Sequence, residues 1–242
     1  VVYFSTSLRQ TGTDQPQHAK IFRATEEGIS VAASVERNEP PLVGSSVVFS
    51  NYYLAANPKV DVGGRLVAYD EGSTCRGASL IACIAYTWWR TRIGDRVFPG
   101  TGTLSRNGRF LGSLSVSSRQ SRQLVVTDFL TNQSGPRIPG NYTFPYFAVG
   151  DDGSAMLTVQ VNGSYWIPAG GGIEQGVRIS DSYAFPFAIH QEAGETIAYF
   201  GGSVLYRVNP RTGERRTIPV PSGCEQLQVE PQSRIFAVCE KN

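Results

Sequence analysis

The 242-residue sequence has no surplus of either charge, because 22 basic residues stand against 20 acidic ones. Nucleic acid is therefore not expected as the main partner, since binding it calls for a strongly basic surface. Apolar runs stay well short of the roughly 18 residues that span a membrane, so no transmembrane segment is expected. The sequence also lacks an initiator methionine and a basic-then-apolar leader, which suggests a processed or trimmed chain.

Common catalytic and metal-binding motifs are also missing. The sequence has no G-x-S-x-G, no H-E-x-x-H and no phosphate-binding loop. Its two histidines, His18 and His190, lie far in sequence from the four cysteines, and the cysteine spacings do not suit zinc. We therefore expect no cofactor, no metal and no catalytic residue that sequence spacing alone could identify.

Glycine and proline, in contrast, are abundant, and they separate short runs of strand-forming residues. The stretch from Gly194 to Val220, GETIAYFGGSVLYRVNPRTGERRTIPV, predicts three strands joined by a Gly201-Gly202 hairpin and an NPRTGE turn. The apolar residues recur at a spacing of two, which favours strands and excludes paired helices. A three-stranded meander buries too little surface to be stable alone, so further copies are expected.

Weaker copies of this stretch occur along the chain. A tight turn precedes an apolar run at Gly64, Gly108, Gly153, Gly194 and Ser233, with steps of 44, 45, 41 and 39 residues. A period near forty that contains about four strands is typical of a β-propeller blade. The sequence therefore predicts an all-β fold, a β-propeller of five or six four-stranded blades.

Several of these segments resemble the TolB or PD40 repeat, a relative of WD40. The segments are GRLVAYD from Gly64 to Asp70, KIFRATEEG from Lys20 to Gly28, and LYRVNPRTGERRTI from Leu205 to Ile218. The resemblance implies a propeller of the kind found in bacterial secreted or envelope proteins. It carries over no active site, because the signature positions of that family are not catalytic.

Both ends of the chain are expected to contribute to one blade. Val1 to Ser5, Ala19 to Ala24 and Ile29 to Ser34 fit its second, third and fourth strands, while Glu225 to Glu230 and Ile235 to Glu240 fit a first and a second strand. Such sharing would close the ring without leaving an open sheet edge. Residues 1–242 would then form a single domain, although a fragment of a longer multidomain chain also fits.

The four cysteines form two local pairs. Cys224 and Cys239 flank a short hairpin, and Cys75 and Cys83 bracket another. Both pairs suit disulfides, which predicts an extracytoplasmic protein, secreted or periplasmic. Four buried free thiols are the alternative.

Unequal connections point to one face of the predicted propeller. The turns between strands one and two and between strands three and four are short. Longer segments are expected on the other side: Leu8 to His18, Val35 to Tyr53, Gly72 to Ser79, Gly135 to Phe144 and Gly172 to Tyr183. Loops of such length tend to be functional. The candidate binding residues are Asp14, His18, Tyr52, Tyr53, Arg76, Tyr142 and Tyr183.

These features favour a non-catalytic, monomeric scaffold whose loops bind a protein or carbohydrate partner. The alternative is a propeller-type glycoside hydrolase or lyase in which carboxylates from different blades converge at the central channel. Asp14, Glu36 and Asp181 are the first candidates for those carboxylates. A separation of about 5 to 10 Å between two such groups would favour the enzyme.

Overall fold

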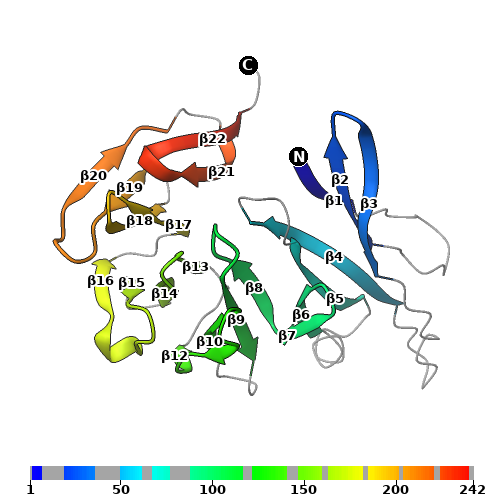
Figure 1. Ribbon diagram of the computed structural model, residues 1–242, viewed down its shortest axis with the longest axis horizontal. Coiled ribbons are helices and arrows are strands. Elements are labelled where there is room, and N and C mark those ends of the chain that lie inside the picture. Colours follow the sequence, from blue (N-terminus) through cyan, green and yellow to red (C-terminus); the bar gives the residue numbers. More distant parts are fainter. Residues whose placement is uncertain are drawn as a thin grey trace. The chain divides into compact units, whose positions relative to one another are not determined.

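The structure is a computed structural model of the chain, and the part that it describes consists of β-strands with two short 3-10 turns. It describes residues 2–6, 19–35, 50–61, 67–76, 88–116, 122–140, 147–159, 163–181, 185–201, 204–220 and 224–239. Two compact units make up the chain, residues 1–102 and residues 103–242. Figure 1 shows their strands in order along the sequence.

The first unit contains two antiparallel sheets. One has the order β1 (Val2–Thr6), β2 (Ala19–Thr25) and β3 (Gly28–Val35). The other has the order β4 (Ser50–Val60), β5 (Val67–Arg76), β6 (Trp88–Ile93) and β7 (Arg96–Pro99). Each strand pairs with the next one along the chain, which is the meander that the alternating apolar pattern predicts.

The second unit contains three antiparallel meanders, each four strands wide, and a final hairpin. The first comprises β8 (Thr101–Leu104), which crosses the boundary between the units, β9 (Phe110–Val116), β10 (Arg122–Asp128) and a divided outer strand, β11 (Gln133–Ser134) and β12 (Ile138–Gly140). The second comprises β13 (Phe147–Val149), β14 (Ala155–Val159), β15 (Gly163–Ile167) and β16 (Val177–Ser180). The third comprises β17 (Phe185–Glu192), β18 (Glu195–Gly201), β19 (Leu205–Val208) and β20 (Arg215–Ile218), and β21 (Cys224–Glu230) then pairs with β22 (Arg234–Cys239).

Side chains of β14 alternate between the two neighbouring sheets. Ala155 and Leu157 belong to an apolar cluster that includes Leu124 of the preceding sheet. Met156, which lies between them, belongs to a second cluster that includes Phe200 of the following sheet. Because successive strand residues point to opposite faces, the β13–β16 sheet is buried on both faces.

The next sheet repeats this arrangement. Ala198 and Phe200 of β18 face the cluster that contains Met156. Ile197 and Tyr199 of the same strand instead pack with Val229 of β21. The sheets of the second unit are therefore stacked face to face in chain order, as blades are.

These stacked four-stranded meanders confirm the predicted class, an all-β protein with the fold of a β-propeller. The predicted turns at Gly108, Gly153, Gly194 and Ser233 separate the first and second strands of successive sheets, and the predicted turn at Gly64 lies outside the described residues. Ring closure by strands from both ends, and the choice between five and six blades, stay predictions.

Connections between blades differ in part from those expected. We call the end of a sheet that holds the first and third connections its turn end, and the opposite end its loop end. The expected loop from Gly172 to Tyr183 is instead a 3-10 turn, Ile173–Gln175, followed by the outer strand β16. β16 forms because Ile179 is buried between blades while Val177 and Arg178 pair with β15. Residues 172–176 therefore lie at the turn end, and residues 177–180 belong to the strand.

Three other expected loops contribute residues to strands. Gly72 to Arg76 extend β5, Ser50 to Tyr53 begin β4, and Ile138 to Gly140 form β12. Gly201, expected in a two-residue hairpin turn, belongs to β18 and pairs with Leu205, and Gly202 lies outside the described residues. Hydrogen-bonded ladders extend these strands beyond the point where the apolar alternation ends.

Candidate functional site

Three predicted binding residues lie together at the loop end of the β4–β5 hairpin. In the ladder, Tyr52 is opposite Thr74, Tyr53 is opposite Ser73, and Arg76 is opposite Ser50. Val60 pairs with Val67 at the other end of the same ladder. The backbone therefore brings Tyr52, Tyr53 and Arg76 to the end of the blade where a site was expected.

The other predicted residues fall mostly outside the described part of the chain. They are Asp14, His18, Glu36, Tyr142, Tyr183 and Cys83. Asp181 is described: its side chain is 91% exposed, and its Oδ1 lies 3.2 Å from Nη1 of Arg178. An exposed pair of this kind has little energetic weight.

One predicted cysteine pair has the expected register. Cys224 and Cys239 are directly opposite each other in the β21–β22 ladder. Opposite residues of an antiparallel pair have Cα atoms about 4.5 to 5.5 Å apart, within the range that a disulfide spans. Cys75 lies in β5, next to Arg76.

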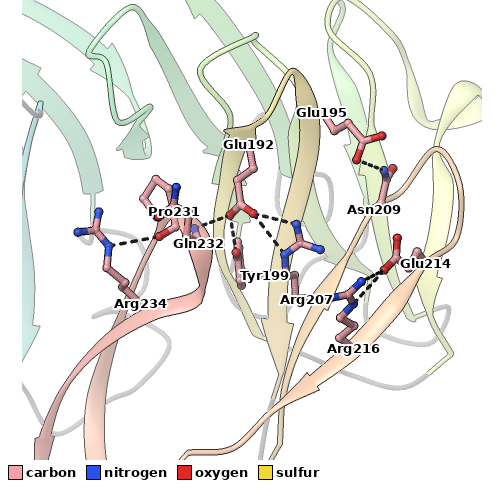
Figure 2. Close-up of polar contacts among 10 residues, drawn as sticks. All are labelled: Glu192, Glu195, Tyr199, Arg207, Asn209, Glu214, Arg216, Pro231, Gln232 and Arg234. Carbon is pink, nitrogen blue, oxygen red and sulfur yellow. Dashed lines mark hydrogen bonds and ion pairs between the residues drawn. The ribbon is translucent and has the colours of Figure 1, made fainter.

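A buried carboxylate joins the last full blade to the final hairpin (Figure 2). Glu192 ends β17, and its side chain is only 9% exposed. Its Oε1 accepts hydrogen bonds from the hydroxyl of Tyr199 and, at 2.9 Å, from the backbone N–H of Gln232. Its Oε2 accepts from Nη2 of Arg207 at 2.8 Å. Glu192 therefore binds two strands of its own blade and the turn of the next one.

These contacts set the ionisation of Glu192. Burial by itself would raise the pKa of the carboxyl group, but the hydrogen bonds from Tyr199, Arg207 and Gln232 outweigh burial and lower the pKa. The same pairing raises the pKa of Arg207. The pair is therefore held in its charged form, which suits a structural ion pair better than a general acid.

Similar links join the other turns of the second unit. Asp151 Oδ1 accepts from the backbone N–H of Asn107 in the preceding blade at 2.7 Å. Asp152 Oδ2 accepts from Oγ1 of Thr196 and from Nε2 of Gln191 in the following blade, at 2.9 and 2.8 Å. The paired residues are 39 to 44 positions apart, which is one repeat.

Two buried carboxylates of the first unit lie on neighbouring positions of β5. Asp70 accepts from Oγ1 of Thr91 at 2.8 Å, from Nζ of Lys59 at 3.0 Å and from the backbone N–H of Gly102 at 3.1 Å. Gly102 cannot carry a larger side chain, because a Cβ atom would lie 2.5 Å from Oγ1 of Thr91. Asp70 therefore connects β5 to β8, the strand that contains Gly102.

Glu71, the second of these carboxylates, lies within an arginine cluster. Its oxygens accept from Nε of Arg90 and from both Nε and Nη2 of Arg92, at 3.1 and 3.0 Å. The Glu71 side chain is 3% exposed. Its hydrogen-bonding capacity is used within the blade.

A cleft of about 240 Å³ opens at the turn end between the second unit's first two blades. Its apolar lining comes from Phe110, Val126, Ile138, Ala155 and Ile167, and its rim includes Asp128, Gln133, Ser134 and the segment 168–171. The volume suits one side chain of a partner, being below the usual range for small-molecule sites. This cleft was not predicted from the sequence, although the break between β11 and β12 that lines it contains Gly135 and Pro136.

The rim carboxylate of the cleft is also paired. Asp128 accepts from Nε and Nη2 of Arg109 at 3.2 and 2.7 Å. The Arg109 hydrogen bonds lower the pKa of Asp128 to about 2. Asp128 therefore stays ionised and paired at neutral pH.

Two further properties concern the described residues alone. No three histidine, cysteine or acidic side chains among them gather closely enough to hold a metal ion. None of their helices is long and apolar enough to cross a membrane.

Comparison with known proteins shows likeness in fold at low sequence identity. No protein-family model and no curated protein sequence matches the chain. The β-propeller domain of the trilobed protease from Pyrococcus furiosus aligns over 78% of both chains, with 11% identity and a TM-score of 0.45. A structure from a study of two prolyl endopeptidases aligns over 93% of this chain but only 44% of its own, with 10% identity and a TM-score of 0.41. At these levels neither likeness bears on function, and the fold class rests on the blades themselves.

Proposed function

We propose that the chain is a TolB/PD40-type propeller module of an extracytoplasmic bacterial protein, and that it binds a protein or carbohydrate partner without catalysing a reaction. The observation that carries this proposal is the state of the buried carboxylates Asp70, Glu71 and Glu192. Each already accepts hydrogen bonds from other side chains of the protein itself. A general acid or base must instead exchange a proton with a substrate that can reach it.

The place where a partner would bind follows from the β4–β5 ladder. Tyr52, Tyr53 and Arg76 share the loop end of this hairpin. Tyrosine and arginine are enriched at the centres of protein interfaces, and aromatic rings also stack well against other flat or apolar surfaces. The turn end, in contrast, carries the links that hold the blades together.

The binding part of the proposal can be tested with two probe sets. The 242-residue chain is applied to an oligosaccharide array and to a library of displayed peptides, and hits are measured by calorimetry. We expect saturable binding of one class and at least a tenfold loss on Tyr52→Ala, Tyr53→Ala or Arg76→Ala. Leu130→Ala is the matched control, because Leu130 is 78% exposed in a turn-end connection.

The non-catalytic part is tested with chromogenic glycosides and peptide substrates. We expect no turnover by the wild-type chain. Turnover that disappears on replacing Asp181, Asp14 or Glu36 by the corresponding amide would support the hydrolase or lyase and overturn the scaffold. Binding that all three loop-end variants retain would refute the assigned location while leaving the absence of catalysis intact.

The proposed compartment is tested through the cysteines. The register of Cys224 and Cys239 supports a disulfide between them. Mass spectrometry after alkylation without reductant should find no alkylated cysteine in protein exported to an oxidising compartment. Four alkylated cysteines in that protein would remove the basis for the secreted or periplasmic assignment.

A further inference from the structure

The turn between β8 and β9 contains an asparagine directly before a glycine, Asn107-Gly108. The side-chain amide of an asparagine can be attacked by the backbone nitrogen of the next residue, and a following glycine hinders that attack least because it has no Cβ atom. Asn107 is exposed, so water reaches its amide. Gly108 has a positive φ of 75°, which favours glycine at this position of the turn. The turn therefore contains the residues that spontaneous deamidation needs.

Deamidation of this pair consumes only water. The backbone nitrogen of Gly108 loses its proton to base and forms a bond to Cγ of Asn107, which gives a cyclic imide. The bond between Cγ and Nδ2 breaks, and Nδ2 leaves as ammonia with a proton equivalent to the one that Gly108 lost. Water then adds to one of the two imide carbonyls and breaks its bond to nitrogen. The products are aspartate and isoaspartate, and in isoaspartate the backbone runs through the former side chain.

Hydrogen bonds within the turn oppose this attack. Oδ1 of Asn107 accepts from Oγ of Ser105 at 2.8 Å and from the backbone N–H of Arg109 at 2.9 Å. The N–H of Gly108, which must lose its proton, donates to the carbonyl of Ser105 at 3.0 Å. Cγ of Asn107 cannot turn towards the nitrogen of Gly108 until these hydrogen bonds break. The reaction therefore requires local opening of the turn.

The next blade holds the same turn closed. The backbone N–H of Asn107 donates to Oδ1 of Asp151 at 2.7 Å, and Nδ2 of Asn107 donates to the backbone carbonyl of Asp151 at 3.3 Å. Asp151 lies in the turn between β13 and β14. The leaving group of the reaction is therefore bound by the neighbouring blade. We propose that Asn107 is a deamidation site controlled by blade contact: the reaction is slow while the two turns are joined and fast when they separate.

The products of deamidation cannot restore this contact. Asp152 is the equivalent residue of the next repeat, and both of its carboxylate oxygens face hydrogen-bond donors. In Asn107 only Oδ1 faces donors, because Nδ2 faces the carbonyl oxygen of Asp151. An aspartate in place of Asn107 would set a carboxylate oxygen against that carbonyl. Isoaspartate would in addition lengthen the backbone of the turn. Each deamidation therefore weakens the contact between the two blades permanently.

Peptide mapping by mass spectrometry, after incubation of the 242-residue chain at mildly alkaline pH, tests the proposal. The change from amide to carboxyl is measured as the mass gain at Asn107, and isoaspartate is detected by enzymatic methylation. The reference for an unprotected site is the peptide LSRNGRF, residues 104–110. We expect Asn107 to react at least about tenfold more slowly in the folded chain than in this peptide, because only the opened turn reacts.

Variants of Asp151 separate the effect of the hydrogen bond from that of the charge. Asp151→Ala should raise the rate at Asn107 about fivefold, because it removes the acceptor of the backbone N–H. Asp151→Asn should change the rate by less than about twofold, since it loses the charge but keeps an oxygen acceptor. Glu174→Ala is the matched control, because Glu174 is an exposed carboxylate at the turn end of the same blade. Circular dichroism confirms that each variant is folded.

Several results would overturn the proposal. One is a rate at Asn107 in the folded wild type equal to that in the peptide. Another is a rate that Asp151→Ala leaves unchanged, or that Asp151→Asn or Glu174→Ala raises to the same extent. A separate measurement needs no change at Asp151: Asn107→Asp should lower the melting temperature by about 2 to 4 °C. An unchanged melting temperature would contradict the expected loss of blade contact.

Discussion

At the scale of single residues, the buried carboxylate of Glu192 has a structural role. Glu192 is buried, yet its pKa is lowered rather than raised, because donors from two blades surround it. A buried ion pair contributes little net stability compared with an apolar replacement, but removing one partner is costly. The role of Glu192 is therefore best measured by a change that keeps its shape.

Glu192→Gln should lower the free energy of unfolding at pH 7 by about 2 to 3 kcal/mol, because Arg207, whose side chain is 21% exposed, would keep a largely buried charge without its partner. Folding lowers the pKa of Glu192, so its contribution is present above the ordinary value of 4.5 and is lost as pH falls through the folded value. The difference between wild type and variant in urea titrations should therefore shrink below about pH 4.5.

Glu214→Gln is the control for this experiment. Glu214 pairs with Arg216, but the side chains of the pair are 50% and 71% exposed, respectively. Its replacement should change stability by less than about 1 kcal/mol. Equal losses in the two variants would show that the inter-blade link of Glu192 has no special weight.

The turn between β17 and β18 offers a second test. Ala193 and Gly194 both have positive φ, 50° and 85°, as a two-residue hairpin turn of this type requires. Alanine is strained in this region and asparagine is tolerated better. Ala193→Asn should raise the free energy of unfolding by about 0.5 to 1 kcal/mol, measured by urea titration.

Gly194→Ala gives the complementary result at the adjacent position. A Cβ atom at Gly194 would meet nothing within 4 Å, so any loss reflects backbone strain alone. We expect a loss of about 1 kcal/mol. An unchanged stability in both variants would contradict the turn conformation.

Residue-level predictability from the sequence depends on how local the signal is. The register of Cys224 with Cys239 could be predicted, because both residues flank one short hairpin. The links of Asp151, Asp152 and Glu192 could not, because their partners lie about one repeat away. A visible signal did exist: acidic residues precede the turn glycine in two successive repeats.

At the scale of elements, β18 determines how neighbouring blades are coupled. Ile197 packs with Val229 in one cluster, while Met156 belongs to the cluster on the other side of the sheet. Double-mutant cycles should therefore give a coupling energy of about 0.5 to 1 kcal/mol for Ile197→Ala with Val229→Ala. Ile197→Ala combined with Met156→Ala should be additive within about 0.5 kcal/mol. The reverse pattern would show that the sheet faces are assigned wrongly.

Element boundaries were predicted less well than element types. The turns at Gly108, Gly153 and Gly194 separate first and second strands as expected. The sequence predicts a loop in place of β16, because this strand has only four residues, of which Arg178 and Ser180 are polar. Outer strands bury few side chains, so alternation gives a weak signal there.

At the scale of the whole molecule, stability should propagate from blade to blade. Ile197, Tyr199 and Leu205 are at most 1% exposed, and they pack with Val229 of the final hairpin. A chain that ends after Gly223 would expose these side chains. We expect its melting temperature to fall by on the order of 10 °C, together with increased binding of a hydrophobic dye.

The matched control ends after Cys239 and removes only residues 240–242. Its melting temperature should equal that of the full chain. Equal melting temperatures for all three chains would show that the final hairpin does not support the preceding blade, against the stacked arrangement.

The repeat period of about forty residues made the fold predictable. A fold built from repeats also made the function hard to predict. Steps near forty residues with alternating strands allow few architectures, so the sheets were predictable. A binding site on a propeller draws residues from several repeats, and even within one blade the candidate residues Tyr52 and Arg76 come from two different strands. Such positions share no sequence spacing, so residue type alone gives candidates and does not show which of them lie together.

The turn-to-turn hydrogen bonds have a consequence for how this protein can change over generations. They hold the blades of the second unit together at the turn end, through backbone amides and a few polar side chains. Segments at the loop end can become longer or gain other side chains without breaking those hydrogen bonds. New ligand preferences can therefore arise there by insertion and recombination, while the hydrogen bonds between the turns of successive blades are preserved.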